Sequence, residues 1–288
     1  MKGSLYLHEP MDRHTTFRIG GPADRFAVPR DTEDFQTLLQ ETPDDEKITV
    51  VGAGSNLLVQ DGGLRGTVVH TKSLDWVRVE TNRASVGAGV QLPGLLRKLS
   101  RRGLGGLEGL AGIPGTVGGA VRMNAGTPEL CMADRLLEAT LLHRSGRVEQ
   151  KKREALNFGY RIMDLPENTW ITSVELQCDP GDPAEIEEAI KKRWAERNQK
   201  QPWSLPSAGS IFKNPPGDYA GRLIEESGMK GARVGDAEVS TMHANFIVNR
   251  GKARAADVLI LIKKVRKKVE QQFGVHLELE IRIVGEPA

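Results

Sequence analysis

The chain has 288 residues, 39% of them hydrophobic and 27% charged, which is enough for one large domain or several smaller ones around a buried core. Its 40 basic and 38 acidic side chains leave a net charge of +2, which gives no reason to expect nucleic acid as a partner. The two cysteines, Cys131 and Cys178, form no metal-ligand spacing and no disulfide framework. They indicate a reducing compartment and predict no metal site.

The N-terminus, M-K-G-S-L-Y-L-H-E-P, contains no apolar core of the kind that a signal peptide has. The longest unbroken aliphatic run is Val258–Ile262, far shorter than the roughly 20 residues of a membrane span. We therefore expect a cytoplasmic protein without a membrane partner, as a monomer or weak oligomer.

Short strands, turns and two helices are predicted up to about residue 180. A strand ending in a Gly-Gly-Pro turn is expected within residues 15–22. Asp31 is expected to cap a helix up to Gln40, and Pro93 and Gly103 suit the start and end of a second helix over Gln91–Arg102. The remaining predicted strands are Phe26–Pro29, Ile48–Val51, Leu57–Val59, Gly66–His70, Leu136–His143 and Trp170–Gln177.

After residue 180 the sequence predicts longer helices. They cover Asp182–Lys200, Tyr219–Ser227 and Ala253–Phe273. The lysines of the last helix indicate a solvated face rather than a nucleic-acid site. Residues 276–284 alternate, with Leu277 and Ile281 on one face and Glu280 on the other. This mixture of elements predicts an α+β protein with a boundary near residue 180.

The stretch V-V-G-A-G-S-N-L-L-V, residues 50–59, begins like a dinucleotide-binding turn of the Rossmann kind. That fingerprint requires a third glycine and a helix directly after the loop. Leu57 occupies the third position, and the residues that follow predict a strand and a turn. Two interpretations remain: a plain glycine turn between strands, or a loop whose exposed backbone N–H groups bind phosphate without a helix.

A second segment places glycine at every third position from Gly103 to Gly118. The run is too short and too poor in proline for collagen. A mobile surface loop is one alternative, but leucine, isoleucine and valine alternate with the glycines. Close approach of the backbone to a ligand explains the pattern better. Two such loops beside strands suit a large ligand with phosphates, such as a dinucleotide.

Eight segments together resemble the UDP-N-acetylenolpyruvoylglucosamine reductase family, flavoenzymes of bacterial peptidoglycan precursor synthesis. They occur in the family's order along nearly the whole chain: residues 15–23, 51–59, 109–126, 158–161, 206–215, 220–231, 243–249 and 277–285. The resemblance implies an FAD-binding fold of the vanillyl-alcohol-oxidase type, with two α/β subdomains, followed by a C-terminal α+β substrate-binding domain.

The resemblance also implies domain boundaries. We expect an FAD-binding domain over residues 1–180, divided near 75–85, and a substrate-binding domain over 181–280. Residues 281–288 would be a strand end that returns toward the FAD domain. The span before Ser210 is short and mostly one helix, which is typical of the shorter family subtype. The tyrosine that closes over the substrate in longer members is therefore not expected.

In the family's reaction NADPH reduces FAD, and the reduced flavin passes a hydride to the enolpyruvyl group of the UDP-sugar. A protein acid protonates the adjacent carbon, and the product is UDP-N-acetylmuramate. Hydride addition develops charge next to a carboxylate, so cations and hydrogen-bond donors must stabilise it. The proton donor must lie within hydrogen-bond reach of the carbon that it protonates.

Three residues match the family's catalytic positions. Ser210, in G-S-I-F-K-N, matches the proton donor, although a serine in a Pro/Gly loop is usually a turn residue. Arg161 matches the arginine that polarises the substrate carboxylate; the alternative is a surface arginine paired with Asp164. Glu280 matches a residue that assists the enolate or proton delivery, and its strand face could equally meet solvent. His243 is interpreted as a structural histidine.

The predicted ligand contacts fall into two sets. The cofactor set holds FAD non-covalently and comprises Gly52, Ala53, Gly54, Ser55, Asn56, Leu57, Ile113, Pro114, Gly115, Gly118, Gly119, Asn124 and Arg282. The substrate set comprises Tyr160, Lys213, Asn214, Arg222 and Asn245, with Arg222 and Asn245 expected near the UDP phosphates and sugar.

Two other functions are compatible with parts of the sequence. Oxidases of small alcohols with the same fold often hold FAD covalently through a histidine, but neither His70 nor His143 lies in a glycine loop. A non-catalytic nucleotide-binding module would not need Arg161, Ser210 and Glu280 together. Both alternatives are therefore less favoured than the reductase.

Overall fold

The computed structural model describes all 288 residues, and they form two compact units built from separate stretches of the chain. The first unit comprises Met1–Tyr6, Phe26–Ala53 and Gly66–Arg197. The second unit comprises Leu7–Arg25, Gly54–Arg65 and Asn198–Ala288. Each unit therefore depends on residues that are far apart in the sequence.

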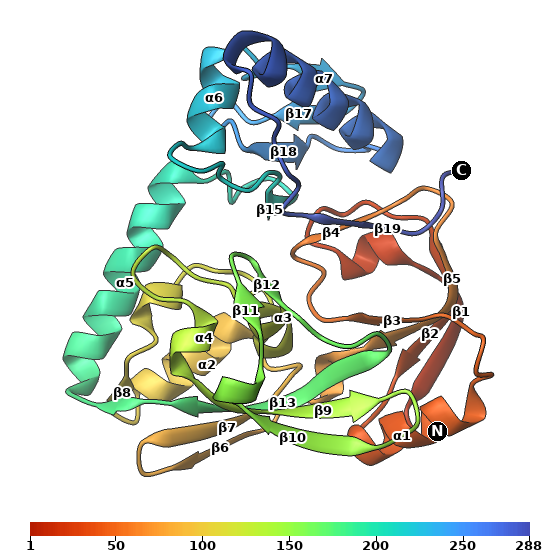
Figure 1. Ribbon diagram of the computed structural model, residues 1–288, viewed down its shortest axis with the longest axis vertical. Coiled ribbons are helices and arrows are strands. Elements are labelled where there is room, and N and C mark those ends of the chain that lie inside the picture. The colour runs from red at the N-terminus through yellow and green to blue at the C-terminus, as the bar shows by residue number, and fades with distance from the viewer. The chain divides into compact units, whose positions relative to one another are not determined.

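The first unit is built on a five-stranded antiparallel sheet in the order β10-β9-β13-β7-β6 (Figure 1). Its strands are β6 (Val77–Glu80), β7 (Arg83–Gly87), β9 (Leu136–His143), β10 (Val148–Lys152) and β13 (Thr169–Gln177). Three helices cover one face of this sheet: α2 (Leu92–Ser100), α3 (Val117–Arg122) and α4 (Met132–Arg135). Leucines and valines of these elements form its core.

A four-stranded sheet lies in the order β1-β2-β5-β3, with the strands β1 (Ser4–Pro10), β2 (Pro22–Val28), β3 (Ile48–Val51) and β5 (Leu64–His70). The helix α1 (Thr32–Glu41) begins as predicted, because the Asp31 side chain accepts a hydrogen bond from the Asp34 amide at 2.8 Å. Phe35 and Leu38 of this helix are fully buried against Val69 and their neighbours.

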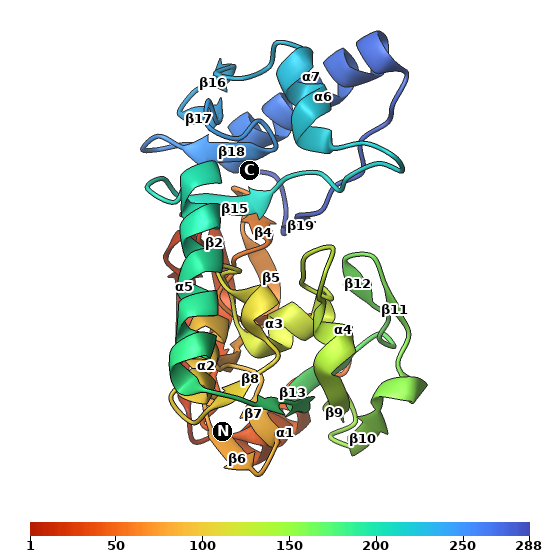
Figure 2. The same cartoon turned by 90° about the vertical axis from the view of Figure 1, so that its left-hand side faces the viewer.

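Short elements complete the first unit. They are the pairs β8 (Leu104–Gly105) with β14 (Asp179–Pro180) and β11 (Phe158–Gly159) with β12 (Ile162–Met163), and most of the helix α5 (Pro183–Lys200), whose residues from Asn198 on belong to the second unit. Ile186 is the buried residue of α5, and a Cβ added at Gly105 would lie 3.2 Å from its Cγ1. The helix therefore runs past β8 with its polar sides exposed (Figure 2).

The second unit contains an antiparallel sheet in the order β15-β18-β17-β16. Its strands are β15 (Ser207–Ser210), β16 (Arg233–Val234), β17 (Ala237–Val239) and β18 (Phe246–Asn249). The helices α6 (Ala220–Glu226) and α7 (Ala255–Phe273) pack on this sheet (Figure 1). The predicted apolar stripe of α7 is buried, from Val258 to Val269.

Residues from the first part of the sequence complete the second unit. Phe17, Ile19 and Leu58 are buried in the same core as α6 and α7. The strand β19 (Arg282–Val284) pairs in parallel with β4 (Leu57–Val59). The Asp61 carboxylate accepts hydrogen bonds from the amides of Ala255 and Ala256 and so caps α7.

Most predicted elements are present, but three predictions need correction. The strand expected within residues 15–22 is absent: Thr15 Oγ1 donates to the Ile19 carbonyl at 3.0 Å, and Arg18 takes a φ of 53°, so the segment turns. The strand expected over 276–284 is reduced to β19, because Leu279 makes only an isolated bridge to Phe212. The glycine segment contains the helix α3, which was not predicted because glycine disfavours helices.

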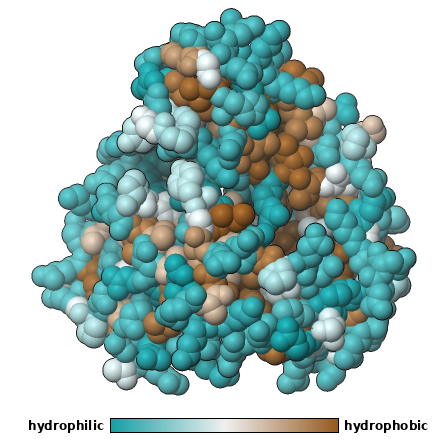
Figure 3. Space-filling view, viewed as in Figure 1, coloured by the Kyte–Doolittle hydropathy of each residue, from teal (hydrophilic) through white to brown (hydrophobic).

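The surface is mixed in character. On the face drawn in Figure 3 most residues are hydrophilic, and hydrophobic residues gather in small patches. None of the helices has both the length and the apolar composition that crossing a membrane would require.

Candidate active site

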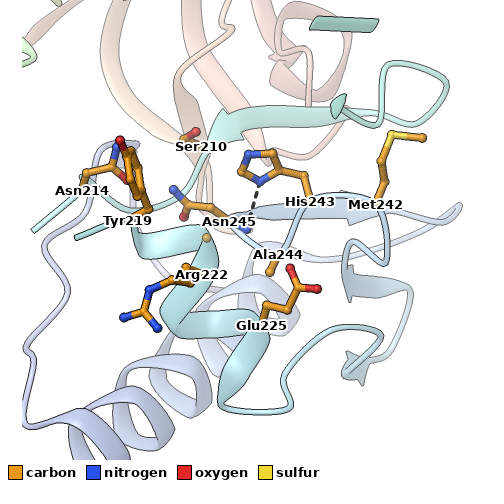
Figure 4. A pocket seen from close by; sticks show the side chains of 10 residues that line it. Ser210, Asn214, Tyr219, Arg222, Glu225, Met242, His243, Ala244 and Asn245 are labelled. Carbon is orange, nitrogen blue, oxygen red and sulfur yellow. Dashed lines mark hydrogen bonds between the residues drawn. The ribbon is translucent and has the colours of Figure 1, made fainter. Parts of the chain in front are cut away.

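A cavity of about 460 Å³ lies in the second unit, between α6, the end of β15 and the turn that precedes β18 (Figure 4). This volume falls in the range of small-molecule sites. Its walls include four residues that the sequence predicted for catalysis or substrate binding: Ser210, Asn214, Arg222 and Asn245. The other lining residues are Tyr219, Gly221, Glu225, Met242, His243 and Ala244.

Ser210 ends β15 at an irregularity of the sheet. The register with β18 shifts between Ser207 and Ser210, and Gly209 between them takes a φ of 76°. Such a bulge re-aims the side chain that follows it. Ser210 is half-buried and lines the cavity. Pairing of Ser210 with Phe246 of β18 gives its backbone a defined position at the cavity wall.

Asn245 holds the segment that follows Ser210. Its Oδ1 accepts a hydrogen bond from the Phe212 amide at 2.9 Å, and its Nδ2 donates to the Phe212 carbonyl at 2.8 Å. Its own carbonyl accepts from the Ile211 amide at 2.8 Å. Only 4% of the surface of Asn245 is exposed. Its side chain joins two backbone segments at the cavity wall, and both ends of its amide already have a hydrogen-bond partner.

Glu280 lies on the segment next to the one that carries Ser210. Its amide donates to the Ile211 carbonyl at 2.9 Å, and its carbonyl accepts from Asn56 Nδ2 at 3.0 Å. The Asn56 carbonyl in turn accepts from the Arg282 amide at 2.9 Å. The structure therefore brings together Ser210, Glu280, Asn56 and Arg282, which are up to 226 positions apart in the sequence.

The start of α6 forms another wall of the cavity. Asn214 Oδ1 accepts a hydrogen bond from the Ala220 amide at 3.1 Å, so this predicted substrate contact also supports the first turn of the helix. Arg222 binds Asp218 with two nitrogens and pairs with Glu226 at 2.7 Å. The Arg222 guanidinium lowers the pKa of Asp218 to about 2. The positive charge of Arg222 is therefore neutralised by Asp218, just before α6, and by Glu226, at the end of α6.

Lys213, which the sequence predicted as a substrate contact, lies just outside this wall. Its Nζ is 3.4 Å from Glu278 Oε2, and its amide donates to the Glu278 carbonyl at 2.9 Å. The glutamate is exposed, so the ion pair is weak and the ammonium can exchange partners.

His243 has a defined orientation that the sequence did not predict. Its Nδ1 accepts a hydrogen bond from the Asn245 amide at 3.3 Å, and its ring meets the Phe246 ring edge-on at 4.9 Å. Burial lowers the pKa of the imidazole. The ring is therefore neutral at physiological pH, with its proton on Nε2.

Arg161 belongs to the first unit, at the turn of the β11–β12 hairpin. It takes a φ of 59°, and its guanidinium carbon lies 5.1 Å from the ring centroid of Tyr160, which is half exposed. Asn124 fixes this hairpin: its Nδ2 donates to the Gly159 carbonyl at 3.0 Å, and its Oδ1 accepts from the Ala133 amide at 3.1 Å. Asn124 is thus a positioning residue for the hairpin.

The predicted cofactor loops meet within the first unit. A Cβ added at Gly52 would lie 2.3 Å from Thr116 Oγ1, and one added at Gly118 would lie 2.7 Å from the Ala88 Cβ. Thr116 is the N-cap residue of α3. Val117 and Gly118 donate their amides to the Val90 and Ala88 carbonyls, so these glycines serve close packing of backbone. Ala53 continues the first loop in this unit, and Ile113, Pro114, Gly115 and Gly119 belong to the second.

The loop that begins at Gly52 continues in the second unit from Gly54. Gly54 has a φ of 62°, and a Cβ added there would lie 2.2 Å from the His14 carbonyl oxygen. Its carbonyl accepts from the Thr16 amide at 3.3 Å. Ser55 and Asn56 follow, and Leu57 starts β4. No helix follows this loop, as the sequence predicted.

Arg197 is a half-buried cation that sequence reasoning missed. Its side chain crosses the second glycine segment, where a Cβ added at Gly112 would lie 2.6 Å from its Cδ. Burial lowers the pKa of its guanidinium, and the neighbouring Arg161 and Arg193 lower it further. Arg193 has a carboxylate partner, Glu129, at 2.9 Å. Arg197 forms no ion pair or hydrogen bond in the chain, so this arginine cluster has a surplus of positive charge.

Comparison with known proteins identifies the family. The C-terminal domain of UDP-N-acetylenolpyruvoylglucosamine reductase matches residues 201–284, and an FAD binding domain matches residues 23–150. The UDP-N-acetylenolpyruvoylglucosamine reductase of Moorella thermoacetica is 47% identical over 287 residues, which cover 99% of this chain and 95% of the relative. The chain belongs to the UDP-N-acetylenolpyruvoylglucosamine reductase family.

A solved structure of the same family supports the fold along the whole chain. The crystal structure of UDP-N-acetylenolpyruvylglucosamine reductase from Thermus caldophilus is 39% identical and has a TM-score of 0.85, with 98% of this chain and 99% of that chain covered. The predicted family and the predicted α+β class, an FAD-binding fold with a C-terminal family domain, are therefore confirmed. The domain boundaries at 180 and 280 stay a prediction.

Sequence reasoning found the reductase-family segments but missed residues outside them. Arg197 lies on a charged helix, where nothing in the sequence separates it from solvated neighbours. His243 lies inside a recognised segment, but its place on the cavity wall depends on surroundings that could not be inferred from the sequence. Tyr219 and Glu225 can be recognised as cavity residues only from the structure, in which α6 lies beside the turn before β18.

Proposed function

We propose that this protein catalyses the FAD-dependent reduction of the enolpyruvyl group of UDP-N-acetylglucosamine enolpyruvate to give UDP-N-acetylmuramate, with NADPH as the hydride donor. The observation that carries the proposal is Ser210, held at a sheet bulge on the wall of a cavity of suitable size, with Glu280 on the adjacent segment. Both residues occupy the positions that the family resemblance assigned to catalysis.

FAD is the cofactor that the first unit suits. Packing contacts hold its glycine loops in one conformation, and Arg197 beside Gly112 supplies a cation without a carboxylate partner, which suits an anionic group such as a diphosphate. Residues of the two loops would hold FAD without a covalent bond. When bound, FAD supplies the hydride for the reduction.

Ser210 supplies the proton. When a hydride adds to one carbon of the enolpyruvyl double bond, the adjacent carbon gains an electron pair and takes the proton from Ser210 Oγ. The irregularity in β15 and the hydrogen bonds from Asn245 to Phe212 fix the backbone on both sides of Ser210, which lowers the entropy cost of the transfer. By the family resemblance, Arg161 supplies positive charge for the developing enolate and Glu280 assists the transfer of the proton.

We further propose NADPH rather than NADH, a cytoplasmic location, and a monomer or weak oligomer. The domain boundaries inferred from the sequence belong to the same proposal. The ratio of kcat/KM for NADPH and NADH tests the nucleotide preference. Cell fractionation tests the location, and the sedimentation coefficient of the purified holoenzyme tests the oligomeric state.

The decisive experiment separates the two half-reactions. With Ser210→Ala, reduction of bound FAD by NADPH should proceed at the wild-type rate in stopped-flow measurements. Reoxidation of the reduced flavin by the enolpyruvyl UDP-sugar should fall by at least 10²-fold, within the usual range for loss of a general acid. Asn214→Ala serves as a variant at the same cavity that leaves the proton donor intact.

Equal loss of both half-reactions in Ser210→Ala would contradict the role of proton donor. A purified wild-type protein that takes up no FAD would contradict the proposed function altogether. Unimpaired reoxidation in the variant would assign the proton to another group.

A further inference from the structure

We propose that His243 is a substrate-positioning residue: its neutral imidazole donates a hydrogen bond from Nε2 to an oxygen of the UDP-sugar in the cavity beside Ser210. The proposal rests on the proposed function and deepens it, since the histidine was interpreted from the sequence as structural. It follows from the geometry of the ring, from its surroundings and from the charges of the cavity.

The ring is oriented by groups on two sides. The Asn245 amide donates to Nδ1, and this bond leaves the proton of the neutral ring on Nε2. Phe246 contacts one side edge-on, and Gly221 of α6 leaves room on another, where an added Cβ would lie 3.3 Å from Cε1. Figure 4 shows the bond from Asn245 and the ring among the residues that line the cavity.

Burial, rather than the charged groups around the ring, favours its neutral form. Glu225 on α6 and Lys230 after it pair with each other at 2.7 Å, and their effects on the pKa of His243 oppose one another. Burial is the largest influence and lowers that pKa. Protonation of Nδ1 would also break the bond from the Asn245 amide. The ring is therefore a fixed donor rather than an acid.

Two of the cavity's polar side chains are engaged within the chain, while the Tyr219 hydroxyl and Asn214 Nδ2 remain as further donors. Arg222 is bound by Asp218 and Glu226, and in Figure 4 its guanidinium points away from His243. Asn245 uses its side-chain amide on Phe212. Ser210 is the proposed proton donor to the substrate carbon. Nε2 of His243 is therefore a donor that a ligand oxygen in this cavity can meet, beside those of Tyr219 and Asn214, and its ring is already oriented by the Asn245 amide.

The test uses a matched pair of substitutions in the FAD-loaded enzyme. Asn in place of His243 keeps an acceptor, Oδ1, for the Asn245 amide but removes the donor at the ε position. Gln in place of His243 keeps a nitrogen donor at that position. The dissociation constants of UDP-N-acetylglucosamine and of UDP are measured by calorimetry, and KM and kcat are measured with the enolpyruvyl substrate.

We expect His243→Asn to weaken binding of UDP-N-acetylglucosamine by about tenfold, the effect of losing one hydrogen bond. KM should rise by a similar factor while reduction of FAD by NADPH stays at the wild-type rate. His243→Gln should recover most of the affinity. If binding of UDP weakens equally, the acceptor lies in the nucleotide or diphosphate; if UDP is unaffected, it lies in the sugar or its acetyl group.

Wild-type affinity in His243→Asn, or an equal loss in both variants, would overturn the proposal and leave His243 with a packing role. These outcomes differ from a failure of the proposed function, in which the wild-type enzyme itself would bind neither UDP ligand and would not oxidise NADPH.

Discussion

At the residue scale, several polar side chains serve the backbone as well as the site. Asn245 and Asn124 were both predicted to bind ligands, and each uses both ends of its amide to join two segments of its unit. Replacing either would therefore move its neighbours, such as Phe212 or the Arg161 hairpin. Loss of activity in such variants would report positioning as much as ligand contact.

Arg197 offers a prediction about charge. Arg197→Met keeps the contact with Gly112 but removes a half-buried cation that has two cationic neighbours and no carboxylate partner. The free energy of unfolding of the ligand-free protein should rise by about 1 kcal/mol, since an unpaired cation is costly to bury. Affinity for FAD should fall. Denaturant unfolding of the apoprotein and titration with FAD measure the two effects.

The control is Arg83→Met, which removes an exposed ion pair with Glu175 and should change stability by less than about 0.5 kcal/mol. A lower stability of apo Arg197→Met would show that the arginine stabilises the first unit itself, and unchanged FAD affinity would remove it from the cofactor site.

At the element scale, the glycine loops show how packing constrains a cofactor site. The turn at Gly52 abuts the N-cap of α3, and the glycines around Gly118 abut β7 and the turn after it. The positions that suggested a phosphate loop are thus required by contacts between elements of one unit. These contacts fix the loop in a single conformation, which also suits a preorganised ligand site.

Gly52→Ala tests this contact. The added methyl group would lie 2.3 Å from Thr116 Oγ1, so the loop or the start of α3 must move. We expect a loss of stability of about 1–3 kcal/mol, typical of overpacking, together with weaker FAD binding. Thermal unfolding with and without FAD measures both.

Gly94→Ala is the matched control for this substitution. Its nearest atom would be the Gln91 Cβ at 3.9 Å, and it lies inside α2, so stability should rise by about 0.5–1 kcal/mol. If Thr116→Ala combined with Gly52→Ala restores no stability, the clash with Thr116 is not the cause of the effect.

At the scale of the whole molecule, the second unit cannot be cut out as a C-terminal piece. Its core contains Phe17, Ile19 and Leu58; β19 pairs with β4; and Asp61 caps α7. The hydroxyl of Thr16 also donates to the Ser207 carbonyl at 2.7 Å. These contacts tie residues 198–288 to two segments from the first quarter of the chain.

We therefore expect a fragment of residues 198–288 to lack a cooperative fold, because its core would lose buried side chains and its last strand would lose its partner. Circular dichroism during urea unfolding of the fragment checks this, with the full-length chain as reference. A cooperative transition of the fragment would instead support a self-contained substrate domain as inferred from the sequence.

The sequence by itself determined most of the longer helices and strands, and it indicated the family to which the chain belongs. Caps such as Asp31 and the apolar stripe of α7 depend on local periodicity and local hydrogen bonds, so they can be recognised without coordinates. The candidate catalytic positions were predicted from segments that resemble the family, and they stay predictions. Short strands such as β16 and β17 went unnoticed, because pairing across the sheet, rather than local preference, creates them.

Only the tertiary structure decided what these residues touch. The surplus charge at Arg197, the compensation of Arg222 and the fixed orientation of His243 all arise from neighbours that are distant in sequence or lie across a turn. Burial and charge pairing are properties of the assembled core, where the surrounding dielectric and the nearest partners set the energy of each polar group. For that reason the cavity beside Ser210 could not be inferred from the pattern of residues alone.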